Sequence, residues 1–177
     1  MELDRKTFDA CFVTARATDR EKFWPFVVPN LIKYEINTSR RIAAFFAQIC
    51  HESGSLHYVK EIASGDAYEG RKDLGNIQPG DGVRYKGRGL IQVTGRANYQ
   101  EMGEIMKLDL IGNPGLLEQP EYAFQSACIF WNSRGLNRLA DIDAFDKITQ
   151  RINGGQNGAN DRRARWETCR KALKVTI

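Results

Sequence analysis

Two glutamates and two histidines lie close together in the stretch CHESGSLHYVKEIA, residues 50–63. Glu52 and Glu61 are carboxylates of the kind that act as acids and bases, and His51 and His57 are of the kind that bind metal ions. A zinc site of the H-E-x-x-H type needs two histidines four residues apart on an unbroken helix. Here they are six residues apart with a glycine between them, and the chain has no third histidine. We therefore expect no metal ion and no cofactor.

The two carboxylates suggest acid–base chemistry on a glycosidic bond. Glycoside hydrolysis uses two carboxyl groups, about 5–5.5 Å apart in retaining enzymes and about 6.5–9.5 Å apart in inverting ones. On one straight helix Glu52 and Glu61 would lie about 13.5 Å apart along the axis and on opposite faces, which neither mechanism could use. The sequence Ser53-Gly54-Ser55 between them can end a helix and turn the chain back. The pair is thus a candidate site, and two solvated surface glutamates are the alternative.

Apolar periodicity predicts the helices that would position this pair. The predicted helices cover 4–17, 20–35, a segment from the N-cap candidates Asn37, Thr38 and Ser39 to the Ser-Gly-Ser turn, 96–107, 120–133, 143–153 with Asp143 as cap, and 161–173. Between them, residues 64–89 contain seven glycines and indicate loops with short strands, followed by a strand-like segment at Leu90–Val93. The sequence predicts a mainly α (α+β) fold with a small glycine-rich β or loop region in its middle.

The composition is that of a soluble globular protein: 177 residues, 42% hydrophobic and 27% charged. No apolar run approaches the ~20 residues that a bilayer requires, so we expect no stable membrane insertion. The N-terminal sequence MELDRKTFDAC has no apolar signal-peptide core, which predicts synthesis in the cytoplasm. The four cysteines, at 11, 50, 128 and 169, form no close pairs, and we expect buried free thiols.

The net charge is +4, and part of it comes from the stretch DRRARWETCRK, residues 161–171. Its basic residues alternate with acidic ones, which is typical of a solvated helix face. The alternative is a surface that attracts polyanions such as nucleic acid or a bacterial cell wall.

Four segments of the chain resemble glycoside hydrolase family 19, the family of chitinases and phage lysozymes. They are RRIAAFFAQICHESGSL (40–56), YEGRKDLGN (68–76), GDGVRYKGRGLIQVTGRANY (80–99) and INGGQNGANDRRARW (152–166). Their order and spacing also match, so the resemblance covers nearly the whole chain. It implies a lysozyme-like two-lobed helical fold, with the glycine-rich β/loop region beside the cleft, and a single catalytic domain over residues 1–177. Without plant-type disulfides, the chain is most similar to an endolysin of a phage that infects Gram-negative bacteria.

The resemblance also implies roles for particular residues. Glu52 matches the general acid, Glu61 the general base that activates water, and Thr94 the hydroxyl residue that positions this water in a single inverting displacement. The positions that match polar groups of the sugar cleft are Tyr68, Arg71, Gln92, Asn98 and Asn153. Two positions depart from the pattern, because Ala97 stands where plant chitinases carry an aromatic ring and Leu90 where they carry proline. These departures bear on the substrate more than on the mechanism.

The leading hypothesis for function is an endolysin that hydrolyses the β-1,4 bonds of peptidoglycan, with a peptidoglycan glycan strand as its partner and no nucleic acid. We expect a monomer that acts on the cell wall in the periplasm and depends on a holin to cross the inner membrane. A chitinase with the same machinery is the alternative. A third hypothesis is a catalytically inactive wall-binding or nucleic-acid-binding domain that uses the basic stretch at residues 161–171.

Overall fold

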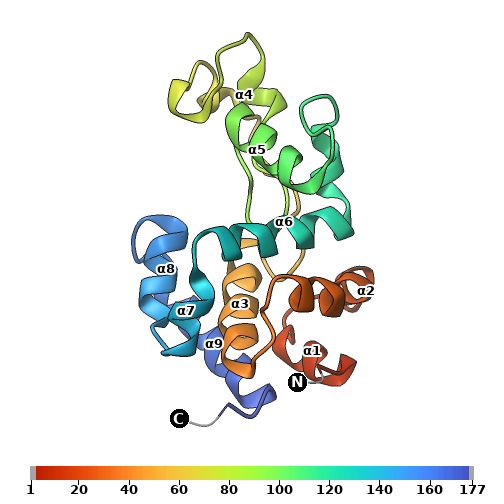
Figure 1. Cartoon of the computed structure of the whole chain (residues 1–177), viewed down its shortest axis with the longest axis vertical. Helices are drawn as coiled ribbons and strands as arrows, with labels where there is room; N and C mark the ends of the chain where they lie inside the picture. Colours follow the sequence, from red (N-terminus) through yellow and green to blue (C-terminus); the bar gives the residue numbers. More distant parts are fainter. Residues whose placement is uncertain (1–2, 176–177) are drawn as a thin grey trace.

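The fold is built around the helix that carries Glu52. The structure is a computed structural model that describes residues 3–175. Helix α3 (Ser39–Glu52) is capped by Thr38, one of the three predicted N-cap candidates, whose hydroxyl accepts a hydrogen bond from the Arg41 amide at 3.2 Å. All residues from Ile42 to Cys50 are buried, so α3 lies at the centre of a helical lobe. Its C-terminal end points toward the second lobe (Figure 1).

The lobe around α3 contains the helices from both ends of the chain (Figure 1). They are α1 (Arg5–Cys11), α2 (Ala17–Lys33), α6 (Pro120–Ser133), α7 (Leu136–Asp141), α8 (Phe145–Asn153) and α9 (Ala159–Ala172). Helix α9 packs along α3 and also contacts α1. The core of this lobe includes Phe8, Phe12, Phe45, Phe46 and Trp131.

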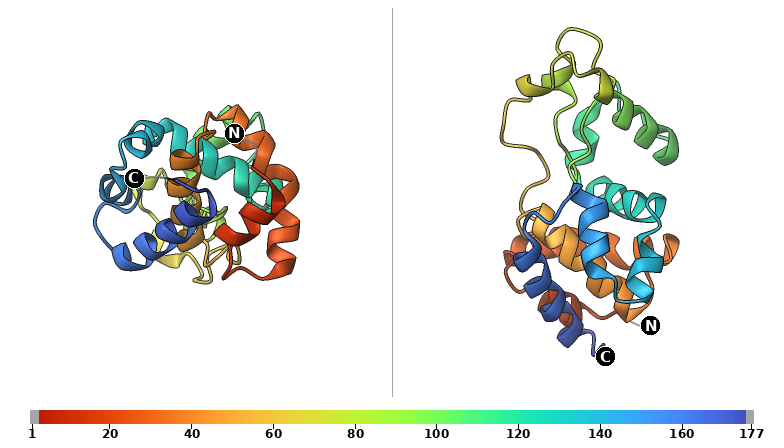
Figure 2. Two further views of the ribbon diagram at one scale, coloured as in Figure 1. Left: turned by 90° about the horizontal axis from the view of Figure 1, so that it is seen from below. Right: turned by 90° about the vertical axis from the view of Figure 1, so that its left-hand side faces the viewer.

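The second lobe is smaller and consists mainly of loops (Figures 1 and 2). Its elements are η1 (Asp66–Tyr68), η2 (Lys72–Leu74), α4 (Asp81–Arg84), α5 (Arg96–Met106) and η3 (Pro114–Glu118). It has a core of its own, which includes Tyr85, Tyr99 and Leu117. Helix α6 belongs to both cores, because Phe124 packs in the larger one and Ile129 in the smaller one.

A sharp turn follows α3 and redirects the chain toward the small lobe. Gly54, Ser55 and Leu56 all have left-handed backbone conformations, with φ of 56°, 63° and 67°. This conformation is unfavourable for non-glycine residues, by about 1–2 kcal/mol each. Contacts compensate: the Leu56 side chain is buried, and the Ser53 hydroxyl accepts from the Leu56 amide at 2.8 Å. The predicted break between Glu52 and Glu61 therefore exists.

Two predicted helix bounds are wrong. The first helix ends at Cys11 and not near residue 17, because the Arg20 guanidinium binds the carbonyls of Phe12 and Ala15 at 3.2 and 2.5 Å and so stabilises an early helix end. Asp143 does not cap α8. Its carboxylate pairs with Arg170 at 3.0 Å, and Ala144 occupies the N-cap position. Helix α7 was not predicted.

The predicted strand at Leu90–Val93 is also wrong, because these residues form a tight turn. The backbones of Arg88 and Val93 exchange hydrogen bonds of 3.1 and 2.8 Å and so enclose the four residues between them. Gly89 and Gln92, with φ of 79° and 56°, close the turn. Within residues 3–175 the β structure consists of isolated bridges at Lys60, Arg88 and Val93.

The four cysteines are free and buried, as predicted. Among the described residues, no helix has the length and apolar character needed to cross a membrane.

Candidate active site

Glu52 lies at the last position of α3 and is held by a buried arginine of α9. Arg162 Nη2 donates to Glu52 Oε1 at 2.6 Å, and the side chains of Arg162 and Glu52 are 2% and 21% exposed. The other end of the guanidinium donates to Gln48 Oε1 at 2.5 Å, and the Gln48 amide donates to Thr149 at 2.9 Å. This network ties α3 to α8 and α9, so the Glu52 carboxylate is fixed in place but reaches solvent.

A second contact between the same helices lies directly beside the first. His51 Nδ1 is 2.6 Å from Asp161 Oδ2, and Arg165 Nε donates to the same oxygen at 2.7 Å. Burial raises the pKa of the Asp161 carboxyl, but the hydrogen bonds from Arg165 and His51 outweigh burial and bring the pKa below its ordinary value. The charged carboxylate therefore anchors the C-terminal end of α3, where Glu52 lies, to α9.

The basic stretch at residues 161–171 is not the free basic face that its sequence suggested. Arg162 binds Glu52, Arg163 binds Asp146, Arg165 binds Asp161, and Arg170 binds Asp143. Two of these arginines, Arg162 and Arg170, are buried. Helical spacing could show the pair of Asp161 and Arg165, which are four residues apart on α9, but not the pairs with acidic residues outside this helix.

Glu61 lies in the loop that follows the left-handed turn, and each of its carboxylate oxygens accepts a hydrogen bond. The Tyr68 hydroxyl donates to Oε1 at 3.0 Å, and the Gly87 amide donates to Oε2 at 3.1 Å. Burial, followed by the hydrogen bond to Glu61 and its charge, raises the pKa of Tyr68, which keeps the hydroxyl protonated as a donor. The Glu61 backbone also donates to the Gly87 carbonyl at 2.9 Å. Glu61 is thus half-buried, and its carboxylate is oriented by hydrogen bonds to both oxygens.

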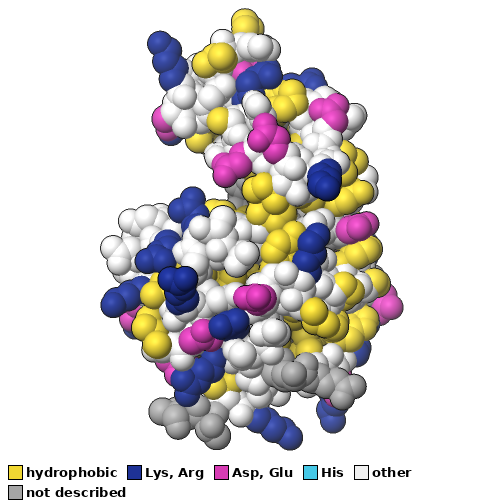
Figure 3. All heavy atoms as spheres, viewed as in Figure 1, with side chains coloured by type: hydrophobic (Ala, Val, Ile, Leu, Met, Phe, Trp, Pro, Cys, Tyr) yellow, Lys and Arg dark blue, Asp and Glu magenta, His cyan; other side chains and the backbone are white. Residues whose placement is uncertain are grey.

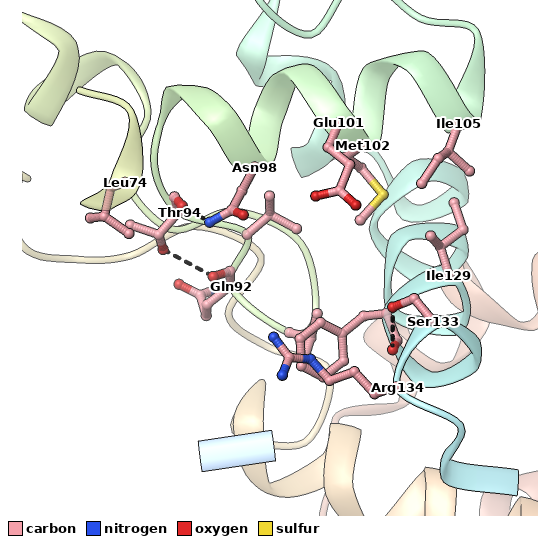
Figure 4. Close-up of a pocket in the computed structure, with 13 residues that line it drawn as sticks. Leu74, Gln92, Thr94, Asn98, Glu101, Met102, Ile105, Ile129, Ser133 and Arg134 are labelled. Atoms are coloured by element: carbon pink, nitrogen blue, oxygen red, sulfur yellow. Dashed lines mark hydrogen bonds between the residues drawn. The ribbon is translucent and has the colours of Figure 1, made fainter. Parts of the chain in front are cut away.

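A groove of about 490 Å³ lies between α5 and the C-terminal end of α6. Figure 3 shows the surface hollowed between the two lobes, and Figure 4 shows the side chains that line the groove. Three of the predicted site residues, Gln92, Thr94 and Asn98, lie together on its wall. The Thr94 hydroxyl donates to the Gln92 carbonyl at 2.9 Å, and the Asn98 amide donates to the Thr94 carbonyl at 2.6 Å.

Gly87 connects this wall to Glu61. A Cβ atom at position 87 would lie 2.6 Å from Gln92 Oε1 and 3.2 Å from Glu61 Oε2. The side chains of Gln92 and Glu61 therefore meet over this glycine, with no room for a methyl group between them. The predicted base therefore adjoins the predicted sugar-binding wall at Gln92, although neither Glu61 nor Glu52 lines the groove itself.

Gly87→Ala is expected to reduce hydrolytic activity at least tenfold while the protein stays folded. The added methyl group must push the end of the Gln92 side chain aside and shift Glu61 by a few tenths of an ångström, and small misplacements of reacting groups reduce rates strongly. Steady-state kinetics beside thermal unfolding measures both effects. Gly115→Ala is a matched control, because no atom lies within 4 Å of its added Cβ. Equal activity of the two variants would contradict this arrangement.

Five predicted site residues do not line the groove: Glu52, Glu61, Tyr68, Arg71 and Asn153. Tyr68 binds Glu61, as described above, whereas Arg71 and Asn153 have other partners. Arg71 is exposed and pairs with Asp73, with Nε 2.7 Å from the carboxylate. Asn153 closes the turn after α8, where its amide donates to the Asn157 carbonyl at 2.9 Å and its oxygen accepts from the Gly155 amide at 2.8 Å. Both remain predictions as ligands of a sugar chain.

Sequence reasoning missed Arg162 as the partner of Glu52. Its segment INGGQNGANDRRARW was recognised, but an arginine in a basic run gives no local signal of burial. The spacing of Arg162 and Cys169, seven residues apart and thus on one helix face, was the available signal, because Cys169 is a buried core residue.

Comparison with known sequences identifies the family. The sequence model of the family described as chitinase class I, glycoside hydrolase family 19, matches residues 33–168. An endochitinase of Arabidopsis thaliana is 42% identical over 118 residues, which are 66% of this chain and 40% of that protein. A glycosyl hydrolase family 19 domain-containing protein of Haemophilus influenzae is 35% identical over 107 residues, 58% of this chain and 49% of that protein. The chain spans less than half the length of these relatives.

Solved structures show the same fold. Chitinase C from Streptomyces griseus superposes with a TM-score of 0.81 at 25% identity, covering 98% of this chain and 77% of that one. A bacterial family 19 chitinase gives a TM-score of 0.78 at 23% identity, covering 98% and 95%, and this likeness concerns the fold alone. The mainly helical, lysozyme-like fold is thereby confirmed. With the family match over residues 33–168, the chain belongs to glycoside hydrolase family 19.

Proposed function

We propose that this protein hydrolyses β-1,4-glycosidic bonds of peptidoglycan by a single inverting displacement. The observation that carries the proposal is the placement of two differently held carboxylates. Glu52 ends the central helix beside Arg162, and Glu61 follows the left-handed turn and meets Gln92 of the groove wall. Family membership supports the same assignment of acid and base.

In the proposed mechanism Glu52 is the general acid. Its Oε1 is bound by Arg162, so Oε2 is the oxygen that carries the proton toward the substrate. This proton goes to the glycosidic oxygen as the bond between that oxygen and the anomeric carbon breaks. The leaving sugar departs with a free hydroxyl group, and Glu52 is left as a carboxylate.

Glu61 and Thr94 act on the opposite face of the sugar. A water molecule that donates one hydrogen to Glu61 and the other to the Thr94 hydroxyl keeps a lone pair directed at the anomeric carbon. The Thr94 hydroxyl uses its own proton to bind the Gln92 carbonyl, so its lone pairs are the groups offered to this water. Glu61 takes the proton as the new bond forms, and solvent exchange returns it to Glu52.

The choice of peptidoglycan over chitin rests on charge. The protein carries a net charge of +4, and Lys and Arg side chains gather on the large lobe beside the hollow between the lobes (Figure 3). Peptidoglycan is anionic and chitin is neutral. Chitin is the second candidate, because several similar proteins are named chitinases or endochitinases.

We also propose a biological role as an endolysin that reaches the cell wall through a holin and acts as a monomer. Two properties support a lysis role. The net positive charge suits an anionic cell wall, and the four free thiols suit a protein that is made in the cytoplasm before it reaches the wall.

The test compares the protein on purified peptidoglycan and on chitin oligosaccharides. We expect faster release of reducing ends from peptidoglycan, and mass spectrometry of the products names the sugar at the new end. Proton NMR of the first products should show the α anomer, as an inverting enzyme requires from a β bond. Faster cleavage of chitin would establish the second candidate, and a β anomer would overturn the single displacement.

A further inference from the structure

One arginine of the groove has no acidic partner. Arg134 follows the last residue of α6, and its exposed side chain lines the groove (Figure 4). Among the described residues, no carboxylate lies within ion-pair distance of Arg134. The guanidinium lies over the ring of Phe130, 4.4 Å from its centroid. It is therefore an oriented cation that the protein itself leaves without a counter-ion.

The buried or half-buried arginines of the protein differ in this respect. Arg88 pairs with Glu118 at 2.8 Å, Arg96 with Asp81 at 2.6 Å, and Arg162 with Glu52 at 2.6 Å. The protein thus neutralises its structural arginines with carboxylates. Arg134 is exposed and, like the exposed Arg84, Arg138 and Arg151, has no carboxylate partner among the described residues. Of these four arginines Arg134 alone lines the groove, which favours a role toward a ligand.

The surroundings of Arg134 strengthen the positive charge on that side of the groove. Arg151 donates to the Arg134 carbonyl at 3.0 Å, which brings a second guanidinium to the same edge. Across the groove the wall is formed by Gln92, Thr94 and Asn98. In Figure 4 the Arg134 guanidinium extends toward the side of the groove on which Gln92 lies. A sugar bound to the amide-lined wall would therefore present its substituents to Arg134.

We propose that Arg134 binds a carboxylate carried on the lactyl arm of peptidoglycan and so selects this polymer over chitin. The inference rests on the proposed function, whose site it deepens. Chitin and peptidoglycan share a β-1,4 backbone of N-acetylated amino sugars, but only peptidoglycan carries lactyl ethers with acidic groups. The planar guanidinium can hold a carboxylate with two parallel hydrogen bonds, and the Phe130 ring fixes its plane. The acid belongs to the lactyl group itself or to the peptide attached to it.

The test measures binding in a Glu52→Gln background, where hydrolysis does not consume the ligand. Three probes are used: glycan strands stripped of peptide, with free lactyl carboxylates; the same strands with these carboxylates converted to amides; and strands that retain their peptides. Arg134→Gln should weaken binding of the stripped acidic strands, the peptide-bearing strands, or both, about tenfold, which corresponds to about 1.4 kcal/mol. Binding of the amidated strands should not change.

Arg138→Gln is the matched control, since it removes the same charge from an exposed arginine of α7 that does not line the groove. It should leave all three affinities at the parent level. A loss confined to stripped strands identifies the lactyl acid as the ligand, and a loss confined to peptide-bearing strands identifies the peptide carboxylate.

Two results would overturn the inference. If Arg134→Gln weakened the binding of acidic and amidated strands equally, Arg134 would shape the groove without recognising the charge of the ligand. Its effect would then act through other residues of the lining, such as Glu101. Unchanged binding of every probe would mean that Arg134 does not meet the ligand. Failure of the proposed function is a separate observation, because it would appear as absence of peptidoglycan hydrolysis by the parent protein.

Discussion

Glu52→Gln is expected to reduce hydrolysis by about 10²–10⁴-fold, the range that general acid catalysis contributes. Glutamine has nearly the same shape as glutamate, and its amide oxygen can still accept the 2.6 Å hydrogen bond from Arg162. It cannot donate a carboxylic proton to the leaving oxygen. The rate constant kcat on peptidoglycan should therefore fall, while the affinity for the glycan stays close to that of the parent. The protein should stay folded with a lower thermal unfolding temperature, because Arg162, whose side chain is 2% exposed, loses its charged partner.

The matched control for this variant is Glu167→Gln, at an exposed position of the same α9 helix that supplies Arg162. It makes the same change of charge and should retain full activity. If Glu52→Gln lysed permeabilised bacteria as fast as the parent, acid catalysis at this position would be excluded. Absence of lysis by the parent protein itself would instead favour the catalytically inactive binding domain of the third hypothesis.

Arg162→Met is expected to lower the free energy of unfolding by about 3 kcal/mol, near the lower end of the range for breaking a buried ion pair. The substitution leaves Glu52 Oε1 and Gln48 Oε1 without the donor that binds them at 2.6 and 2.5 Å. The lower end applies because the Glu52 side chain is 21% exposed, so water can replace part of the lost contact. Urea unfolding at neutral pH measures the change.

Arg163→Met provides the comparison, because Arg163 pairs with Asp146 on the surface, where both side chains are 53% exposed. Such a pair contributes about 0–1 kcal/mol. Combining Arg162→Met with Glu52→Gln should recover part of the lost stability, since the charge left unpaired is removed. A loss below 1 kcal/mol for Arg162→Met alone would contradict the role assigned to this guanidinium.

Local physical signals explain which parts of the fold the sequence could predict. Thr38 is a good N-cap with an apolar run behind it, so the start of α3 was predictable. The early end of α1 depends on Arg20, which binds carbonyls of Phe12 and Ala15. That contact joins two helices, and no pattern within the first helix reveals it. The Leu90–Val93 segment has strand-forming residues, but the cross-bonds between Arg88 and Val93 turn it into a loop.

The candidate site also contains residues that the sequence could predict and residues that it could not. Glu52, Glu61 and Thr94 were found because their segments resemble a known family, and on composition alone each would pass for an ordinary surface or strand residue. The partners that orient them come from distant parts of the chain. Arg162 reaches Glu52 across 110 residues, and Gly87 reaches Glu61 across 26. Such partners follow from helix packing and loop closure, which single-sequence patterns do not encode.

Helix α6 contributes to two separate apolar cores, with Phe124 in one and Ile129 in the other. Unfolding of either lobe would expose one face of α6 to water. It would also remove packing contacts that hold α6 in place for the core of the other lobe. The halves that form the groove are therefore thermodynamically coupled and should lose their structure in one cooperative transition. Rearrangements of the lobes that accompany sugar binding must then proceed by small rigid rotations about α6, without independent unfolding of the small lobe.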